Sequence, residues 1–290
     1  MPASPTALVL HGGAGAEPGR DYGRQIENMR QLAELGRDRL RRGASALDLV
    51  CEIVAGLEAA GFYVAGRGAS PNTEGRYELD ASLMDGASRR AGAVAGLEGF
   101  KSPIAAARAV MEETPHVLLI GEGACRFSEA RGLERIEDEA GWFTHADHDV
   151  ADANRLSHGT VGCVILDGEG RLAAGTSTGG VFGKPLGRVG DAPLISCGTW
   201  ADDRVAVSCT GLGEFFIRAA AAHQIAARVR YGGDSLMGAA EAVLDEVRAL
   251  GGDGGLIALD REGNIAMPWN SQGMKRAAVH PDGRIEVAVF

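Results

Sequence analysis

The chain has 290 residues, of which 45% are hydrophobic and 23% are charged, a balance typical of globular proteins. No apolar run approaches the roughly 20 residues that span a bilayer, so we expect no membrane anchor. Lysine and arginine total 29 against 39 aspartates and glutamates, which gives a net charge of -10. That charge opposes binding to polyanions, so nucleic acid is not an expected partner.

The N-terminus and the cysteines bear on the cellular compartment. The opening residues MPASPTALVLHGG contain neither a basic leader nor a long apolar segment, so we expect no secretory signal. The cysteines are odd in number and include no CxxC pair, which argues against a disulfide framework and a zinc ribbon. We therefore expect a cytoplasmic protein with reduced thiols at Cys51, Cys125, Cys163, Cys197 and Cys209.

Hydrophobic periodicity in the first half of the chain changes between strand and helix patterns. Apolar residues at helical spacing predict two amphipathic helices within 25–60, and Ser45 is placed to cap the second one. Period-two alternation further along predicts a pair of strands. The expected elements are a strand at 7–10 that enters a glycine loop at 11–15, the two helices, strands at 77–86 and 91–96, and a helix at 103–111.

The second half begins after a polar, unperiodic segment at 142–158, which predicts an exposed connector. Because elements of one kind follow each other in pairs, we predict an α+β fold in which antiparallel sheets stack and helix pairs cover them. The expected elements are a hairpin of strands at 160–166 and 172–177, helices at 214–230 and 235–250, and a hairpin of strands at 256–260 and 265–267.

One motif suggests a serine hydrolase. Residues 175–179 read GTSTG and match GxSxG, and HGG at 11–13 resembles the loop that supplies an oxyanion-hole amide in lipases and esterases. That mechanism needs a sharp turn from strand to helix after the serine. The following residues 180–185, GVFGKP, do not begin a helix, so this reading is not favoured.

Metal and phosphate sites are also weakly supported. The segment HADHD at 145–149 contains suitable ligand types for zinc, but its spacing fits no metal motif and a solvated linker explains it equally. The glycine clusters include no GxxxxGK[ST] sequence. We therefore expect neither a transition-metal site nor a nucleotide site.

Thr160 offers a third kind of chemistry. It follows Gly159 at the junction between the predicted connector and a predicted strand. A free N-terminal amine on threonine can act as the base for its own hydroxyl, and its ordinary pKa of about 7.7–8.0 suits that task. Cutting the bond between Gly159 and Thr160 would supply both groups together. On the residues alone, Thr160 is more simply the β-branched first residue of a strand.

Eight short blocks spread over nearly the whole chain are more specific than any single motif. They are HGGAG at 11–15, ELDASLMDG at 78–86, AGAVAG at 91–96, PHVLLIGEGA at 115–124, HGTVGCVILD at 158–167, TSTGG at 176–180, GRVGDAPLI at 187–195 and SCTGLGE at 208–214. In this order they resemble the plant-type asparaginase and isoaspartyl peptidase family.

This resemblance implies an N-terminal nucleophile (Ntn) hydrolase with a four-layer αββα sandwich. The whole chain, 1–290, would be one such domain that cuts itself between Gly159 and Thr160. The products would be an α subunit, 1–159, and a β subunit, 160–290, which stay associated because their strands interleave. Two such pairs would form a homodimer of cleaved pairs.

The resemblance also assigns catalytic roles. Thr160 would attack the side-chain amide of asparagine or the β-linked bond of an isoaspartyl dipeptide, forming a β-aspartyl ester. Thr178 would hydrogen-bond Thr160 and hold its rotamer. Thr210, through its hydroxyl, and Gly211, through its backbone N–H, would form the oxyanion hole, where one donor typically contributes about 3 kcal/mol.

Two charged residues match the family's recognition of the amino-acid head group. Arg188 would fork onto the substrate α-carboxylate, and Asp191 would accept from the α-ammonium, with Gly211 also lining the substrate site. Small β-aspartyl substrates are therefore expected, with isoaspartyl dipeptides preferred over free asparagine. No cofactor is required by this chemistry. A structural sodium ion on backbone carbonyls of the loop that contains Leu57, Glu58, Tyr63 and Ala65 is the one ion that the resemblance suggests.

One departure from the family pattern concerns substrate preference and turnover. The family commonly has Phe-Asn-Ala-Gly where this chain has Tyr63-Val64-Ala65-Gly66. Valine cannot supply the amide, and Asn72 is a nearby candidate to replace it. This departure leaves open an uncleaved or weakly active homologue that binds an amino acid through Arg188 and Asp191. A glycosylasparaginase, which needs room for a glycan, is a second alternative within the same fold.

Overall fold

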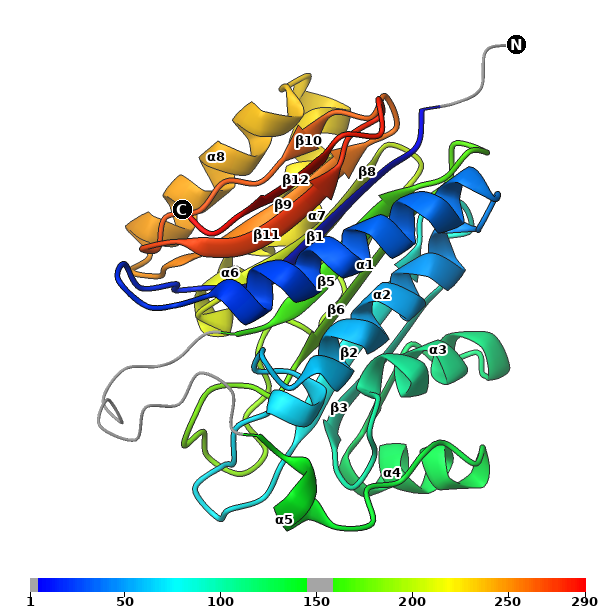
Figure 1. Cartoon of the computed structure of the whole chain (residues 1–290), viewed down its shortest axis with the longest axis vertical. Helices are drawn as coiled ribbons and strands as arrows, with labels where there is room; N and C mark the ends of the chain where they lie inside the picture. Colours follow the sequence, from blue (N-terminus) through cyan, green and yellow to red (C-terminus); the bar gives the residue numbers. More distant parts are fainter. Residues whose placement is uncertain (1–4, 145–158) are drawn as a thin grey trace.

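The structure, a computed structural model, describes residues 5–144 and 159–290 as two β-sheets with helices packed on them (Figure 1). Up to residue 144 the elements are β1 (Ala7–Ala14), α1 (Gly23–Arg41), α2 (Ala46–Ala60), η1 (Gly66–Gly68), β2 (Leu79–Asp85), β3 (Ala91–Leu97), α3 (Pro103–Glu113), β4 (Leu118–Ile120), α4 (Gly121–Ala130) and α5 (Glu139–Trp142). From residue 159 onward they are β5 (Val161–Leu166), β6 (Leu172–Thr178), β7 (Thr199–Ala201), β8 (Val205–Gly211), α6 (Gly213–Ala219), α7 (Ala221–Ala227), the π-helical turn η3 (Arg228–Gly232), α8 (Leu236–Ala249), β9 (Gly254–Asp260), β10 (Ile265–Ala266), β11 (Met274–Val279) and β12 (Ile285–Ala288).

The larger sheet has eight strands in the order β12-β11-β1-β5-β6-β2-β3-β4. Its neighbours pair antiparallel except for β3 and β4, which are parallel. The smaller sheet has the order β10-β9-β8-β7 and is antiparallel throughout. Strands from the two halves of the chain are interleaved in the larger sheet, since β1 lies between β11 and β5 and β2 lies beside β6.

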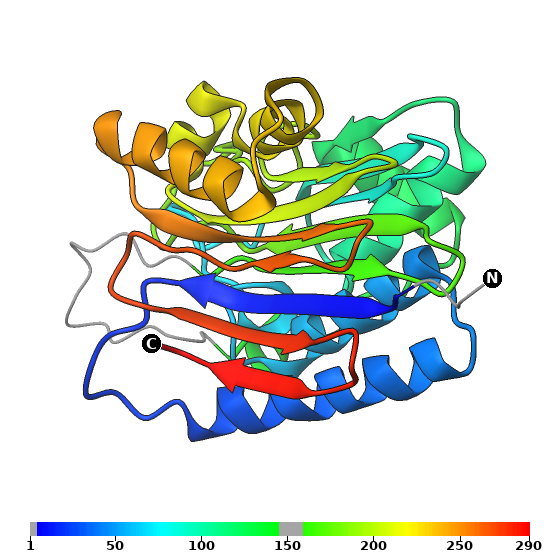
Figure 2. The same ribbon diagram turned by 90° about the horizontal axis from the view of Figure 1, so that it is seen from above.

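Each central strand of the larger sheet is buried on both faces, because successive side chains point to opposite sides. In β5, Val161, Cys163 and Ile165 join the core that contains the apolar residues of α1, α2 and α3, whereas Val164 and Leu166 join the core of the smaller sheet. Helices α7 and α8 pack against β8 and β9 on the other side of that core. Figure 2 shows the blue helices and the yellow-to-orange helices on opposite sides of the strands.

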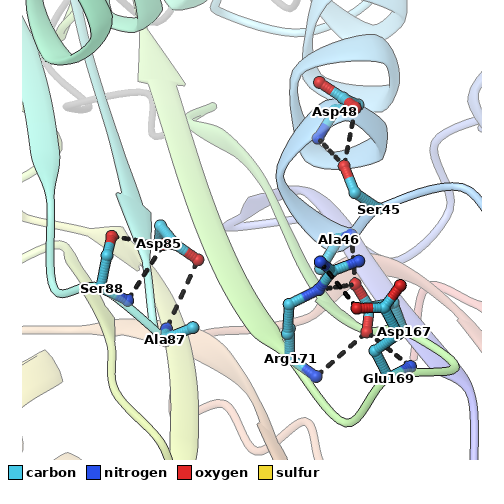
Figure 3. Close-up of polar contacts among 9 residues, drawn as sticks. All are labelled: Ser45, Ala46, Asp48, Asp85, Ala87, Ser88, Asp167, Glu169 and Arg171. Atoms are coloured by element: carbon cyan, nitrogen blue, oxygen red, sulfur yellow. Dashed lines mark hydrogen bonds and ion pairs between the residues drawn. The ribbon is translucent and has the colours of Figure 1, made fainter.

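Helix α2 is fastened at its start to the turn between β5 and β6 (Figure 3). Ser45 caps the helix as predicted, because its hydroxyl accepts from the Asp48 N–H at 3.2 Å. The buried carboxylate of Asp167 accepts from the N–H of Ala46 at 2.9 Å and from Nε of Arg171 at 2.9 Å. The hairpin therefore keeps a fixed position along the helix.

Most of the predicted elements are confirmed, including the hairpin β5–β6 and the antiparallel pair β2–β3. The loop predicted at 11–15 is wrong, since strand β1 continues to Ala14 through a bulge after His11. The single helix predicted at 214–230 is also wrong, because Ala220 has a positive φ of 46° and divides it into α6 and α7. Of the connector at 142–158, residues 145–158 lie outside the described part of the chain.

Two expectations from composition can be compared with the structure. Within residues 5–144 and 159–290, no helix is long and apolar enough to cross a membrane. All five cysteines are free thiols, as expected, and Cys51, Cys163 and Cys209 are buried. Burial raises the pKa of the Cys51 thiol to about 12, so it stays protonated and packs as a small apolar residue.

The contact between β3 and α3 predicts a sensitive position at Gly92. A Cβ there would lie 2.1 Å from the carbonyl oxygen of Ala107 and 2.6 Å from the backbone nitrogen of Met111. Since both are backbone atoms of α3, Gly92→Ala should lower the free energy of unfolding by about 1–3 kcal/mol. Urea denaturation measures this loss.

Gly123, in the exposed part of α4, is the matched control because a Cβ there would meet nothing within 4 Å. Gly123→Ala should leave stability unchanged or raise it by up to about 1 kcal/mol. Equal effects of the two substitutions would contradict the tight packing of β3 on α3.

Candidate active site

Thr160 immediately precedes β5 and lies opposite Thr178, the last residue of β6. The register that pairs Val161 with Ser177 brings the next pair together. The Thr160 side chain is 6% exposed, and its Oγ1 donates to Oγ1 of Thr178 at 3.1 Å. The predicted contact between the two threonine hydroxyls is therefore present in the structure.

The Thr178 hydroxyl is fixed by more than Thr160. It also accepts from the N–H of Gly180 at 3.0 Å, and it lies 3.5 Å from the carbonyl oxygen of Val64. With both acceptor positions occupied, the Thr178 side chain has one favourable rotamer. This arrangement orients the Thr160 hydroxyl without adding a charged group.

Val64, the position that departs from the family pattern, lies directly against Gly159. A Cβ on Gly159 would sit 2.3 Å from Cγ2 of Val64, so only glycine fits in front of Thr160. The carbonyl oxygen of Val64 also accepts from the N–H of Gly179 at 2.8 Å. Position 64 thus contributes a backbone acceptor and an apolar side chain beside the Gly159–Thr160 bond.

Asn72 does not replace the missing amide. Its Nδ2 donates to the carboxylate of Glu78 at 2.9 Å, and its Oδ1 accepts from the backbone N–H groups of Glu74 and Arg76. These hydrogen bonds use the Asn72 side chain to stabilise the turn that follows it in the sequence. The suggestion made from the sequence is therefore wrong.

A small pocket, partly open to solvent, lies next to the two threonines. The predicted catalytic, substrate-binding and autocleavage residues all line it except Thr210, and Gly180, Val181 and Gly190 complete the wall. The lining residues are Gly159, Thr160, Thr178, Gly180, Val181, Arg188, Gly190, Asp191 and Gly211.

Arg188 reaches the pocket while bound to Glu214, a partner that the sequence did not suggest. Nε and Nη2 of Arg188 donate to the two carboxylate oxygens of Glu214, each at 2.8 Å. The Arg188 side chain is 13% exposed and that of Glu214 is 54% exposed. Glu214 looked only like an acidic residue in the first turn of a helix, 26 residues away in sequence.

Asp191 presents a buried carboxylate to the same pocket. It is 3% exposed, and within the described chain its Oδ2 has no hydrogen-bond partner. Burial raises the pKa of Asp191 to about 7, although the nearby Arg188 charge opposes this and Glu214 adds to it. A buried acceptor without a partner is suited to a cationic ligand group.

Thr210 and Gly211 end strand β8 next to the pocket. Thr210 is fully buried, and its hydroxyl accepts from the N–H of Ala14 at 3.2 Å. That bond uses an acceptor position and leaves the Thr210 O–H able to donate. A Cβ on Gly211 would lie 2.4 Å from the carbonyl oxygen of Asp253, so only glycine lets the two backbone segments lie this close together.

The serine-hydrolase reading has no support in the geometry. Ser177 lies inside β6, fully buried, and the chain after Thr178 forms turns until β7. His11 lies 2.9 Å from Ser208 rather than beside Ser177. Because burial lowers the pKa of His11 to about 3, its ring is neutral.

The proposed ion loop is compact. Leu57 and Glu58 belong to the last turn of α2, and the carbonyl oxygen of Tyr63 accepts from the N–H of Ala65 at 2.7 Å. The Glu58 side chain points away, accepting from the Ile104 N–H at 3.0 Å. Burial raises the pKa of Glu58 to about 7. The Glu58 carboxylate is thus engaged at the start of α3, and within the loop the carbonyl oxygen of Ala65 accepts from the N–H of Gly68 at 3.1 Å.

A carboxylate- or histidine-based metal site is absent from the part of the chain that the structure describes. Within residues 5–144 and 159–290, no three histidine, cysteine, aspartate or glutamate side chains are grouped to hold a metal. The segment HADHD at 145–149 lies outside the described residues.

Comparison with known proteins gives matches over almost the whole chain. Residues 4–289 match the family model described as Asparaginase. The isoaspartyl peptidase of Escherichia coli K12 is 47% identical, over 93% of this chain and 91% of the relative. A plant-type L-asparaginase of Pyrococcus horikoshii is 39% identical over 93% and 95%, and a probable isoaspartyl peptidase/L-asparaginase of Arabidopsis thaliana is 36% identical over 98% of each chain. The chain therefore belongs to this asparaginase family.

Proposed function

We propose that this protein is a self-cleaving amidohydrolase that hydrolyses isoaspartyl dipeptides and L-asparagine through Thr160. The observation that carries the proposal is the Thr160 hydroxyl, bonded to Thr178 inside a pocket that also holds Arg188 and Asp191. The relatives named isoaspartyl peptidase and plant-type L-asparaginase support the same chemistry. Isoaspartyl dipeptides are the better substrates in this proposal.

Maturation begins with attack of the Thr160 hydroxyl on the carbonyl carbon of Gly159. The peptide C–N bond breaks as an ester forms, the Thr160 nitrogen takes up the proton, and water then hydrolyses the ester. The products are the α subunit, 1–159, and the β subunit, 160–290. The interleaving of strands in the larger sheet supports their continued association, and we propose that two such pairs form a homodimer.

The contacts between helices and sheets support the Ntn-hydrolase arrangement that the resemblance implies. Helices α1, α2 and α3 contact the larger sheet, α6, α7 and α8 contact the smaller sheet, and the two sheets contact each other. We propose that these are the four layers of an αββα sandwich forming one domain, in which Thr160 immediately precedes a central strand.

Catalysis uses the freed amine of Thr160 as its base. The amine takes the hydroxyl proton while Oγ1 attacks the β-carbonyl carbon of the substrate, and it then gives that proton to the departing ammonia or amine. Thr178 positions the hydroxyl. The Thr210 O–H and the Gly211 N–H stabilise the oxyanion, and water hydrolyses the resulting β-aspartyl ester to release aspartate.

Substrate recognition depends on the two charged residues of the pocket. The unpaired Oδ2 of Asp191 suits the α-ammonium, and the donors of Arg188 that Glu214 leaves free suit the α-carboxylate. A free head group is needed to meet both, which favours small β-aspartyl compounds over bonds inside a folded protein.

Thr160→Ala tests the central claim. The variant should remain a single chain of 290 residues and show no hydrolysis of asparagine or of β-aspartyl dipeptides, because the nucleophile of both reactions is gone. A denaturing gel, intact mass and a coupled aspartate assay measure these outcomes, and kcat/KM for the two substrates tests their ranking.

The matched control is Thr114→Ala, which removes a hydroxyl bonded to Val110 at the end of α3 and should leave cleavage intact. Continued cutting of the Thr160→Ala chain at Gly159–Thr160 would exclude intramolecular attack. A wild-type chain that binds aspartate but never cleaves would instead favour the amino-acid-binding alternative.

The raised pKa of Asp191 predicts a pH-dependent KM. Its carboxyl is ionised above about pH 7 and protonated below it, so KM for asparagine should rise as the pH falls through this value. Asp191→Asn should raise KM at pH 8 by tenfold or more, since a charge-assisted hydrogen bond contributes about 1.5–3 kcal/mol. It should also remove the pH dependence of KM. Initial rates between pH 5.5 and 8.5 measure both, and a KM that stays flat in the wild type would refute this role.

A structural sodium ion is a further part of the proposal. The carbonyl oxygens of Leu57 and Glu58 end a helix and lack partners within it, and a Cβ on Gly66 would lie 2.7 Å from the Glu58 oxygen. Neutral carbonyl oxygens are the ligand type proposed for this monovalent cation, and those of Tyr63 and Ala65, which also accept from the N–H groups of Ala65 and Gly68, belong to the same loop.

Sodium chloride should therefore raise Tm above its value in choline chloride at equal ionic strength. Gly66→Ala should abolish the difference between the two salts. Equal Tm values for the wild type in both salts would argue against the ion.

A further inference from the structure

The ion pair between Arg188 and Glu214 joins a buried cation to an exposed carboxylate. The Arg188 side chain lines the pocket and is largely buried, whereas the Glu214 side chain is more than half exposed. Both bonds are 2.8 Å long and parallel, which is the geometry of a fork on a carboxylate. Such a pair fixes the direction of the guanidinium, not only its presence.

Glu214 determines which donors of Arg188 remain for a ligand. A guanidinium has five N–H groups, and Glu214 takes the one on Nε and the neighbouring one on Nη2. The edge formed by Nη1 and the second N–H of Nη2 is left with two parallel donors. Only this edge can form a second fork on a carboxylate.

The backbone of Gly190 restricts the position of the Arg188 guanidinium from another side. A Cβ on Gly190 would lie 2.9 Å from Nη1 and 3.4 Å from both Cζ and Nη2 of Arg188, so the guanidinium rests against the Gly190 backbone. Gly190 and Arg188 both line the pocket. The orientation of Arg188 is thus set by a carboxylate on one edge and a backbone surface next to it.

The other charges around Arg188 would change the orientation of its guanidinium if Glu214 were replaced. The carboxylates whose charges act on Arg188 are Glu214, Asp191 and Asp80. Asp191 and Asp80 are both buried, and no hydrogen bond joins either to Arg188 in the described chain. Without Glu214, the guanidinium would be attracted towards these buried carboxylates.

We propose that Glu214 is a positioning residue that makes the enzyme selective for substrates with a free α-carboxylate. It occupies one edge of Arg188 so that the other edge is presented to the substrate, and it keeps Arg188 away from the acceptor that the substrate ammonium needs. This inference rests on the proposed function and adds the basis of head-group selectivity.

The test compares Glu214→Gln with the wild type on two substrates. Asparagine carries the α-carboxylate, and β-alaninamide is the same amide without it. Glu214→Gln should raise KM for asparagine about tenfold with kcat changed less than about threefold, and should leave kcat/KM for β-alaninamide unchanged. Arg188→Ala should likewise lose activity on asparagine and not on β-alaninamide. The double variant should have the same kcat/KM for asparagine as Arg188→Ala alone.

The inhibition constants of L-aspartate and β-alanine provide a second readout, since these compounds differ by the same carboxylate. Glu214→Gln should raise the inhibition constant of L-aspartate about tenfold and leave that of β-alanine unchanged. Glu262→Gln, which removes an exposed charge next to Asp260 at the far end of β9, is the matched control and should behave as wild type.

The outcomes separate this inference from the function beneath it. A wild-type protein that hydrolyses neither asparagine nor isoaspartyl dipeptides would refute the proposed function. If the wild type is active, equal loss on both substrates would assign Glu214 a structural role, and no loss on either would make the ion pair irrelevant. Either of these results overturns the inference alone.

Discussion

The antiparallel pairing of β5 with β6 is the constraint on which the site geometry depends. Its register places Thr160 opposite Thr178, and β5 and β6 are central strands of the larger sheet. At the turn end of the hairpin, Asp167 binds the start of α2. At the open end, the segment after α2 returns through Val64, whose carbonyl accepts from Gly179. Helix and hairpin thus hold each other at both ends, which gives the Thr160 hydroxyl a rigid support.

The parts of the fold with clear periodicity could be predicted from the sequence. Helix α2, with its Ser45 cap, and the hairpin β5–β6 have patterns that short-range physics explains. The extension of β1 through glycines to Ala14 could not be predicted, because it is stabilised by β5 and β11, which come much later in the chain. Strand β8 was missed because it is buried on both faces and shows no simple alternation.

The site divides in a similar way. The residues of the family motifs, such as Thr160, Arg188 and Asp191, line one pocket as expected. What the sequence could not reveal is how they are held. Glu214, in the first turn of α6, binds Arg188, which comes 26 residues earlier, and Val64 lies against Gly159, which comes 159 − 64 = 95 residues later. Neither contact could be predicted from the spacing of the residues in the sequence, since each depends on tertiary packing.

The interleaving of strands in the larger sheet also bears on how a cut chain would recover from unfolding. Strand β1 has both its neighbours, β5 and β11, in the later half, and β6 lies between β5 and β2. A chain opened between Gly159 and Thr160 would then contain two pieces with unpaired strand edges, neither able to complete the sheet alone. Such a protein would melt as one cooperative unit. Its refolding would be a bimolecular encounter, so the recovered fraction would fall on dilution, as for a heterodimer.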